Sequence, residues 1–108
     1  MEITLLVGAA PYRLNAEDAA WLEALIRERC SDESGRALSI DETVWGCVLL
    51  ANVLREDLAR GSSPEPIELG RPHVEGLLTF VLREEDAIER GGDVLALYEA
   101  LLQFRGRS

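Results

Sequence analysis

Apolar and polar residues follow two short, strand-like patterns at the start of the chain. Residues 3–7, Ile-Thr-Leu-Leu-Val, are β-branched residues and leucines, which is the composition of a strand. Residues 12–14, Tyr-Arg-Leu, alternate apolar and polar as a second, half-buried strand would. Residues 8–11 between them, Gly-Ala-Ala-Pro, have the composition of a turn. We therefore predict an N-terminal β-hairpin with a turn of about four residues.

Residues 16–30 carry apolar side chains at the three- and four-residue spacing of an amphipathic helix. Asn15 stands just before this stretch, where its side chain can accept a hydrogen bond from a free N–H group of the first turn. Glu17 and Asp18 add negative charge at the positive end of the helix dipole. Together these features predict a first helix over 16–30.

A second helix is predicted over about 41–60. Residues 44–54 are apolar nearly all round, which is typical of a buried central helix. Either Ser39 or Asp41 can cap the N-terminus of this helix. We expect Trp45 to lie in the core or, alternatively, to anchor an interface, where tryptophan is enriched.

The second half of the chain begins with a Gly/Ser/Pro-rich connector over 61–66. Residues 67–69, Ile-Glu-Leu, then alternate as a third short strand would. Pro72 suits the first turn of a helix, because that turn does not need its missing N–H group. We predict a third helix over 72–90. Its apolar stripe comprises Val74, Leu77, Leu78, Val81, Leu82 and Ile88.

A fourth helix is predicted over 94–104, where apolar residues again recur at helical spacing. Gly91 and Gly92 end the preceding helix, because glycine tolerates the left-handed conformation. Asp93 follows them and can cap the fourth helix.

These elements predict a mostly helical α+β fold in a single domain spanning residues 1–108. A chain of this size buries a core without help from disulfides or metals. The halves 1–61 and 66–108 share an order of strand followed by helices. A two-fold internal repeat explains this order, and so does chance similarity between strand–helix units. Both interpretations stay open.

The composition of the chain excludes two classes of partner and one class of chemistry. The chain has 20 acidic and 11 basic residues, all 11 of them arginine, and its net charge is −9. The arginines are dispersed beside carboxylates, whereas phosphate backbones are bound by clustered Lys and Arg, so we expect no nucleic-acid partner. Without lysine, Schiff-base chemistry is excluded. The longest apolar stretch is shorter than the roughly 20 residues that span a bilayer, so we expect no membrane partner.

The expected compartment of the protein determines the expected redox state of its two cysteines. The N-terminus lacks the basic region and the long apolar run of a secretion signal, so we expect a cytoplasmic protein. Cys30 and Cys47 then stay reduced, although the sequence leaves a bridge between them open. Cys47 has the surroundings of a small core residue. Cys30 lies at a helix end near Arg27 and Arg29, whose charge would lower its pKa and make it reactive.

Candidate ligand-binding residues lie near the start of the third helix. Arg71 and His73 belong to its first turn, and the N-termini of helices bind anions. A pocket between the hairpin and the helices would bring Arg13 to the same anionic ligand. His73 is not surrounded by a catalytic or metal-ligand spacing, so we predict no catalytic residue, no metal and no cofactor. The acidic run 84–86 is interpreted as a solvated face.

Generous apolar stripes and acidic charge favour an interaction protein. A face on the first and fourth helices would suit a homodimer, and we predict that it contains Trp21, Leu25, Tyr98 and Leu102. The acidic charge would equally suit a basic protein. We therefore predict a non-catalytic protein–protein interaction or regulatory domain that binds a second copy or a basic partner. The alternative is an anion sensor or small enzyme with its site near the third helix.

Overall fold

The computed structural model describes residues 1–107, and its N-terminal hairpin confirms the predicted pair of strands. Strand β1 (Glu2–Val7) pairs antiparallel with β2 (Ala10–Asn15). Gly8 and Ala9 alone form the turn, so the prediction of a four-residue turn is wrong. Both residues have positive φ angles, 56° and 72°. This conformation follows the twist of a hairpin, so pairing extends to the turn itself.

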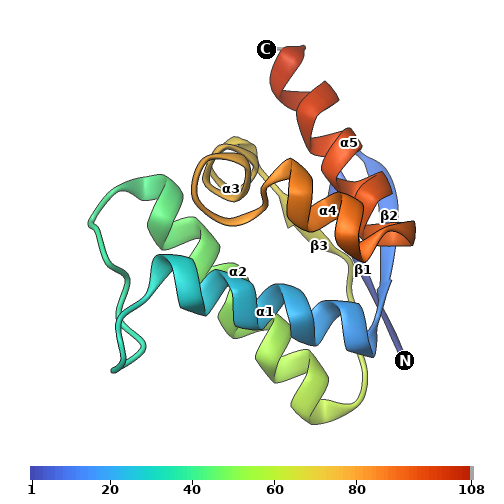
Figure 1. Ribbon diagram of the computed structural model, residues 1–108. Helices are drawn as coiled ribbons and strands as arrows, with labels where there is room; N and C mark the ends of the chain where they lie inside the picture. Colours follow the sequence, from blue (N-terminus) through green and yellow to red (C-terminus); the bar gives the residue numbers. More distant parts are fainter. Residues whose placement is uncertain (108) are drawn as a thin grey trace.

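The third strand also forms as predicted, and it completes a three-stranded sheet (Figure 1). Strand β3 (Ile67–Leu69) pairs parallel with β1, and the strand order is β2-β1-β3. The parallel pairing requires a long crossover, which the two helices between β2 and β3 supply. An internal repeat would equate β2, the strand that directly precedes the helices of the first half, with β3, the strand that precedes those of the second half. These two strands flank β1 rather than pair with each other. The repeat itself stays a prediction.

Two long helices confirm the predicted spans, α1 (Ala16–Cys30) and α2 (Glu42–Arg60). Asn15 caps α1 as predicted, since its side chain accepts a hydrogen bond at 2.8 Å from the N–H group three residues later. Asp41 rather than Ser39 caps α2, and its carboxylate accepts from the N–H group two residues later at 2.8 Å. These caps fix where each helix begins and therefore which of its faces meets the core.

The buried carboxylate of Asp57 binds the connector that follows α2, residues 61–66. Gly61 ends α2 in the left-handed conformation, with a φ angle of 73°. Asp57, which is buried, accepts a hydrogen bond at 3.0 Å from the hydroxyl of Ser63 and lies 3.5 Å from the guanidinium of Arg60. These partners satisfy the carboxylate and turn the chain back toward β3.

The single helix predicted over 72–90 is wrong, because this segment is interrupted. It consists of α3 (Arg71–Gly76), the π-helical turn η1 (Leu77–Val81) and, after two extended residues, α4 (Glu84–Arg90). The part of the chain that the structure describes therefore has five α-helices, where the sequence predicted four.

This interruption has a long-range cause. Asp86 accepts a hydrogen bond at 3.0 Å from the backbone N–H group of Arg83 and so caps α4. Arg29 of α1 binds the same carboxylate at 2.7 Å and also donates to the carbonyl of Val81. The ion pair ties the end of η1 and the start of α4 to α1. Ile88, which the prediction placed in the apolar stripe, is consequently 60% exposed.

The last helix is α5 (Gly92–Gly106), which confirms the predicted fourth helix with slightly wider bounds. Gly91 is its N-cap residue, so the expectation that Asp93 caps it is wrong. Gly91 and Gly92 have φ angles of 68° and 51°, a backbone conformation that L side chains rarely adopt. The two glycines therefore allow the sharp reversal from α4 into α5.

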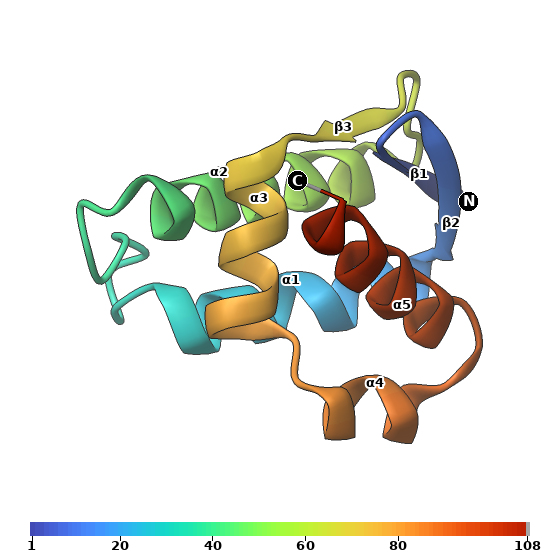
Figure 2. The ribbon, with the colours of Figure 1, turned by 90° about the horizontal axis from the view of Figure 1, so that it is seen from above.

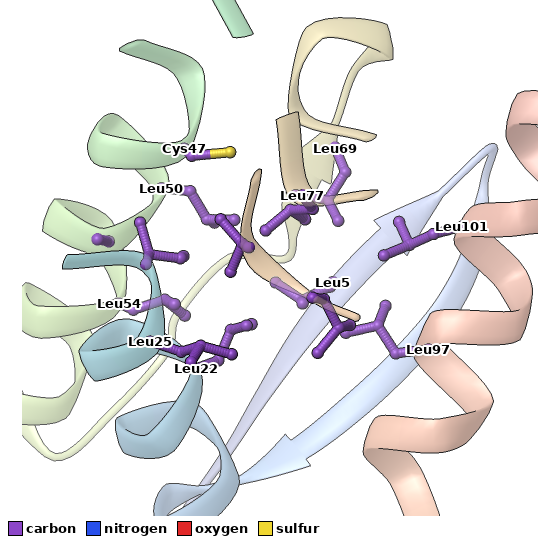
Figure 3. Packing of buried hydrophobic residues seen from close by; sticks show 14 of the residues in the cluster. Leu5, Leu22, Leu25, Cys47, Leu50, Leu54, Leu69, Leu77, Leu97 and Leu101 are labelled. Carbon is purple, nitrogen blue, oxygen red and sulfur yellow. The ribbon is translucent and has the colours of Figure 1, made fainter. Parts of the chain in front are cut away.

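Apolar side chains from the sheet and from the long helices converge on a core (Figure 3). α3 packs on α2, its continuation η1 reaches α1, and α5 covers the hairpin (Figure 2). The crossing of α3 over α2 depends on Gly76, because a Cβ atom there would lie only 2.4 Å from the carbonyl oxygen of Thr43. Within residues 1–107, no helix is long and apolar enough to cross a membrane.

Candidate interaction surface

A group of large apolar side chains on α2 and on the loop before it is exposed to solvent. We call it the α2 apolar surface. It consists of Leu38 (62% exposed), Ile40 (95%), Trp45 (51%), Leu49 (53%) and Val53 (38%). The three helical members stand four residues apart and therefore share one face of α2. Single exposed apolar residues are ordinary, whereas a group of them makes this surface the candidate interaction surface of the chain.

The α2 apolar surface exists because α2 is apolar nearly all round while its neighbours cover only part of it. α1 and α3 pack against α2. The buried positions of the helix are Val44, Gly46, Cys47, Val48, Leu50, Ala51, Leu54 and Asp57. Trp45 and Leu49 fall on the uncovered side. The interpretation of Trp45 as a core residue is therefore wrong, and its interpretation as an interface anchor stays a prediction.

A groove of about 420 Å³ runs between α2 and the preceding loop. Ile40 of the loop and Trp45 and Leu49 of α2 line it. The polar side chains of Ser39 and Asn52 border it. The groove is thus mostly apolar and carries a few hydrogen-bonding groups, which is typical of protein sites that receive side chains.

Hydrogen bonds within the loop between α1 and α2 determine where the loop residues of this surface lie. The carboxylate of Asp32 accepts from the backbone N–H groups of Ser34 and Arg36, each at 2.9 Å. The Ser34 hydroxyl donates to the same carboxylate at 2.7 Å, and this bond, followed by those from the backbone, lowers the pKa of Asp32 below its ordinary value. The N–H group of Leu38 donates to the carbonyl of Cys30 at 2.8 Å, which returns the loop to the end of α1.

The border of the α2 apolar surface is mainly acidic. Asp41 and Glu42 lie at its N-terminal end, Glu56 lies one turn beyond its C-terminal end, and all three are exposed. Hydrogen bonds from Thr43 keep the pKa of Asp41 below its ordinary value, so its charge persists at neutral pH. Arg36 is a cation that lines the groove.

The interface that the sequence predicted on the first and last helices lies in a more closed environment. Leu25 is buried in the core, and Trp21 and Tyr98 are partly buried against it. Leu102 is also partly buried. Trp21 and Leu25 line a small cavity of about 250 Å³ whose other wall is α4. A homodimer face at these residues stays a prediction.

Two residues of the predicted anion site, Arg13 and Arg71, lie in separate places. Arg13 is exposed on β2 opposite Thr4. Arg71 follows β3, whose last residue, Leu69, pairs with Val7 at the far end of β1. At a rise of about 3.3 Å per residue, Thr4 and Val7 lie about 10 Å apart along β1. Arg13 lies beside Thr4 on the β2 side of β1, whereas Arg71 lies beyond Val7 on the β3 side. The structure therefore does not bring Arg13 to Arg71.

His73 caps α3 rather than offering a free positive charge. Its Nδ1 atom accepts a hydrogen bond at 3.0 Å from the N–H group of Gly70. Burial lowers the pKa of His73 below its ordinary value, so the ring is neutral at pH 7. Arg71 lies in a shallow cavity that also contains Glu42 and Glu75, whose charges oppose an anion. This geometry gives no support to the anion-binding alternative.

Cys30 and Cys47 meet in the core, where both are buried and free. The neighbouring Cys47 thiol lowers the pKa of the Cys30 thiol, while burial raises it. Arg27 and Arg29, from which the sequence predicted this effect, are instead engaged by carboxylates at 2.8 and 2.7 Å. A lowered pKa of Cys30 was thus expected for the wrong physical reason.

One of the three acidic side chains at the start of α4 has a structural role. Glu84 and Glu85 are exposed, as a solvated face requires, but Asp86 is the partner of Arg29. This pair lowers the pKa of Asp86 and raises the pKa of Arg29. Among residues 1–107, no three His, Cys, Asp or Glu side chains gather in a way that would hold a metal ion.

Comparisons with protein-family models, with curated proteins and with solved structures find no match to this chain.

Proposed function

We propose that this chain is a non-catalytic protein-interaction domain that binds a partner through the α2 apolar surface. The observation that carries the proposal is the uncovered face of α2, on which Trp45 and Leu49 are each about half exposed beside an apolar groove. Exposing large apolar side chains to water costs free energy, roughly 25 cal/mol per Å² of apolar area. A partner that covers them recovers this free energy, and tryptophan is among the residues most often dominant in interfaces.

The charge around the surface favours a basic partner over a second copy. Asp41, Glu42 and Glu56 border it, and the chain as a whole carries a charge of −9. Two such chains repel each other, whereas arginine or lysine side chains placed around an apolar centre would complement the border. The proposed partner surface therefore combines apolar side chains for the groove with basic residues on their flanks.

A displayed library of random peptides tests this proposal directly with the purified full chain. We expect the selected peptides to combine Leu, Phe or Trp with Arg or Lys. Binding of a selected peptide should fall at least about 30-fold for Leu49→Glu, because a carboxylate would replace a central apolar contact. It should also weaken with added salt, because the flanking contacts are ionic.

Ile88 on α4 offers a matched control, since it is a similarly exposed apolar residue away from the α2 apolar surface. Ile88→Glu should bind the selected peptides as tightly as the unmodified chain does. Equal binding by Leu49→Glu, or selection of peptides without basic residues, would contradict the proposal. So would a dimer in light scattering that Leu49→Glu dissociates, because a second copy would then be the partner.

A further inference from the structure

The two thiols in the core differ in how firmly the surrounding elements cover them. Cys47 lies in the middle of α2, and α3 packs closely on its sulfur, because a Cβ atom added at Gly76 would lie 2.6 Å from that sulfur. Cys30 is the last residue of α1 and directly precedes an exposed loop. Opening a helix end requires far less of the core to move than opening a central helix. Cys30 is therefore the thiol that a small solute can reach first.

Only a few contacts cover Cys30 from the loop side. The carbonyl of Cys30 accepts from the N–H group of Leu38, and Ser31 pairs with Ala37 in a short antiparallel bridge. Most other loop residues are exposed. When this bridge opens, Cys30 meets solvent while Cys47 remains covered by α3.

The chemistry of the pair is as asymmetric as its surroundings. The interaction between the two thiols lowers the pKa of Cys30 and raises the pKa of Cys47, and burial adds to the increase for Cys47. The thiolate is the form of cysteine that attacks electrophiles. Cys30 is accordingly the attacking thiol, and Cys47 is placed to react with it afterwards.

We propose that Cys30 and Cys47 form an oxidation site at which hydrogen peroxide closes an intramolecular disulfide. The Cys30 sulfur attacks one peroxide oxygen, the O–O bond breaks, and the released hydroxide takes up the Cys30 proton as water. Cys30 is then a sulfenic acid. The Cys47 sulfur attacks the Cys30 sulfur, the S–O bond breaks and the S–S bond forms, and hydroxide leaves as water with the Cys47 proton. The two sulfurs together lose two electrons, which the peroxide gains.

This inference does not depend on the proposed function, although the loop that starts after Cys30 carries two residues of the α2 apolar surface. The test treats the purified full chain with dilute hydrogen peroxide, blocks remaining thiols by alkylation and digests the chain after arginine without reductant. Cleavage then separates Cys30, in peptide 30–36, from Cys47, in peptide 37–55. We expect these two peptides to be recovered as one linked species that dithiothreitol separates.

The same reaction in urea distinguishes a built site from two cysteines that merely share a chain. Dimedone is added with the peroxide, so that it competes with Cys47 for the sulfenic acid of Cys30. Because the fold holds the thiols together, the ratio of linked peptides to dimedone adduct should be at least about tenfold higher in the folded chain than in the unfolded chain. Equal ratios in the folded and the unfolded chain would overturn the proposal. Recovery of the two cysteines as separate sulfinic or sulfonic acids from the folded chain would also overturn it.

Single variants identify the attacking thiol. Cys47→Ala should stop at the sulfenic acid of Cys30, which a sulfenic-acid trap such as dimedone labels. Cys30→Ala should leave Cys47 unlabelled in the folded chain, with circular dichroism confirming the fold of each variant. Preferential labelling of Cys47 would overturn the proposed order. The comparison of folded and unfolded chain uses the unmodified protein, so it stands even if a variant fails to fold.

Discussion

The two tryptophans of the chain show how similar helix positions acquire opposite surroundings. Trp21 on α1 is partly buried, because the guanidinium of Arg90 lies over its ring at 5.5 Å. Asp18 and Glu17 hold that guanidinium at 2.8 and 3.2 Å. Trp45 on α2 is 51% exposed and borders an open groove. Arg90 of α4, an element distant in sequence, covers the ring of Trp21 within the chain, whereas half of Trp45 stays exposed.

Replacing Trp21 should have the largest effect on stability. Trp21→Ala removes a ring that packs against the core and supports Arg90, so we expect a loss of about 3 kcal/mol in the free energy of unfolding. Urea denaturation followed by circular dichroism measures this loss. A loss below about 1 kcal/mol would mean that the contact between α1 and α4 is not what closes this side of the molecule.

The ion pair between α1 and α4 should come next. Asp86→Ala removes both the partner of Arg29 and the cap of α4, and it should cost about 2 kcal/mol in the free energy of unfolding. Glu85→Ala is the matched control, because this neighbouring carboxylate is exposed, and it should change stability by less than about 0.5 kcal/mol. Equal effects of the two variants would contradict a specific role for Asp86.

Acid should weaken the same contact. Arg29 lowers the pKa of Asp86 in the folded chain below the unfolded value of about 3.9. The pair therefore contributes its full stability above that value and loses it as the pH falls through the folded pKa. Between about pH 5 and pH 2, Asp86→Asn should lose stability less steeply than the unmodified chain. Parallel slopes would show that other carboxylates dominate acid unfolding.

Trp45→Ala should have the smallest effect on stability, within about 0.5 kcal/mol in the same denaturation experiment, because the ring is half exposed. Its binding to selected peptides should nevertheless fall strongly, as for Leu49→Glu. A loss of stability as large as that of Trp21→Ala would remove the distinction between the two tryptophans and with it the basis for the α2 apolar surface.

Local patterns predicted most of the fold, because caps and periodicities are contained in a few neighbouring residues. Asn15 and Asp41 are examples, since each caps the helix that directly follows it. The break after η1 was missed because it depends on Arg29 and Asp86, which lie far apart in the sequence. The short turn was missed because its second residue, Ala9, adopts a positive φ angle that glycine or asparagine usually provides.

The candidate site was harder to predict than the fold. Periodicity shows that a helix face is apolar, but it does not show whether another element covers that face, and Trp45 fell on the uncovered side. Leu38 and Ile40 offered a usable sign, because they are apolar residues in an otherwise polar loop. For the residues predicted from residue type alone, Arg13 and His73, long-range structure decides the outcome, because the sheet places Arg13 and the α3 cap engages His73.

The parallel pairing of β3 with β1 affects how the chain emerges during synthesis. Until residues 67–69 have been made, the hairpin and α1 can form, but β1 has one edge without a partner. That edge spans Leu5 to Val7, and free edges of apolar strands readily pair with other chains. A nascent chain arrested in the connector would therefore be the most aggregation-prone intermediate, and completion of β3 would end that exposure.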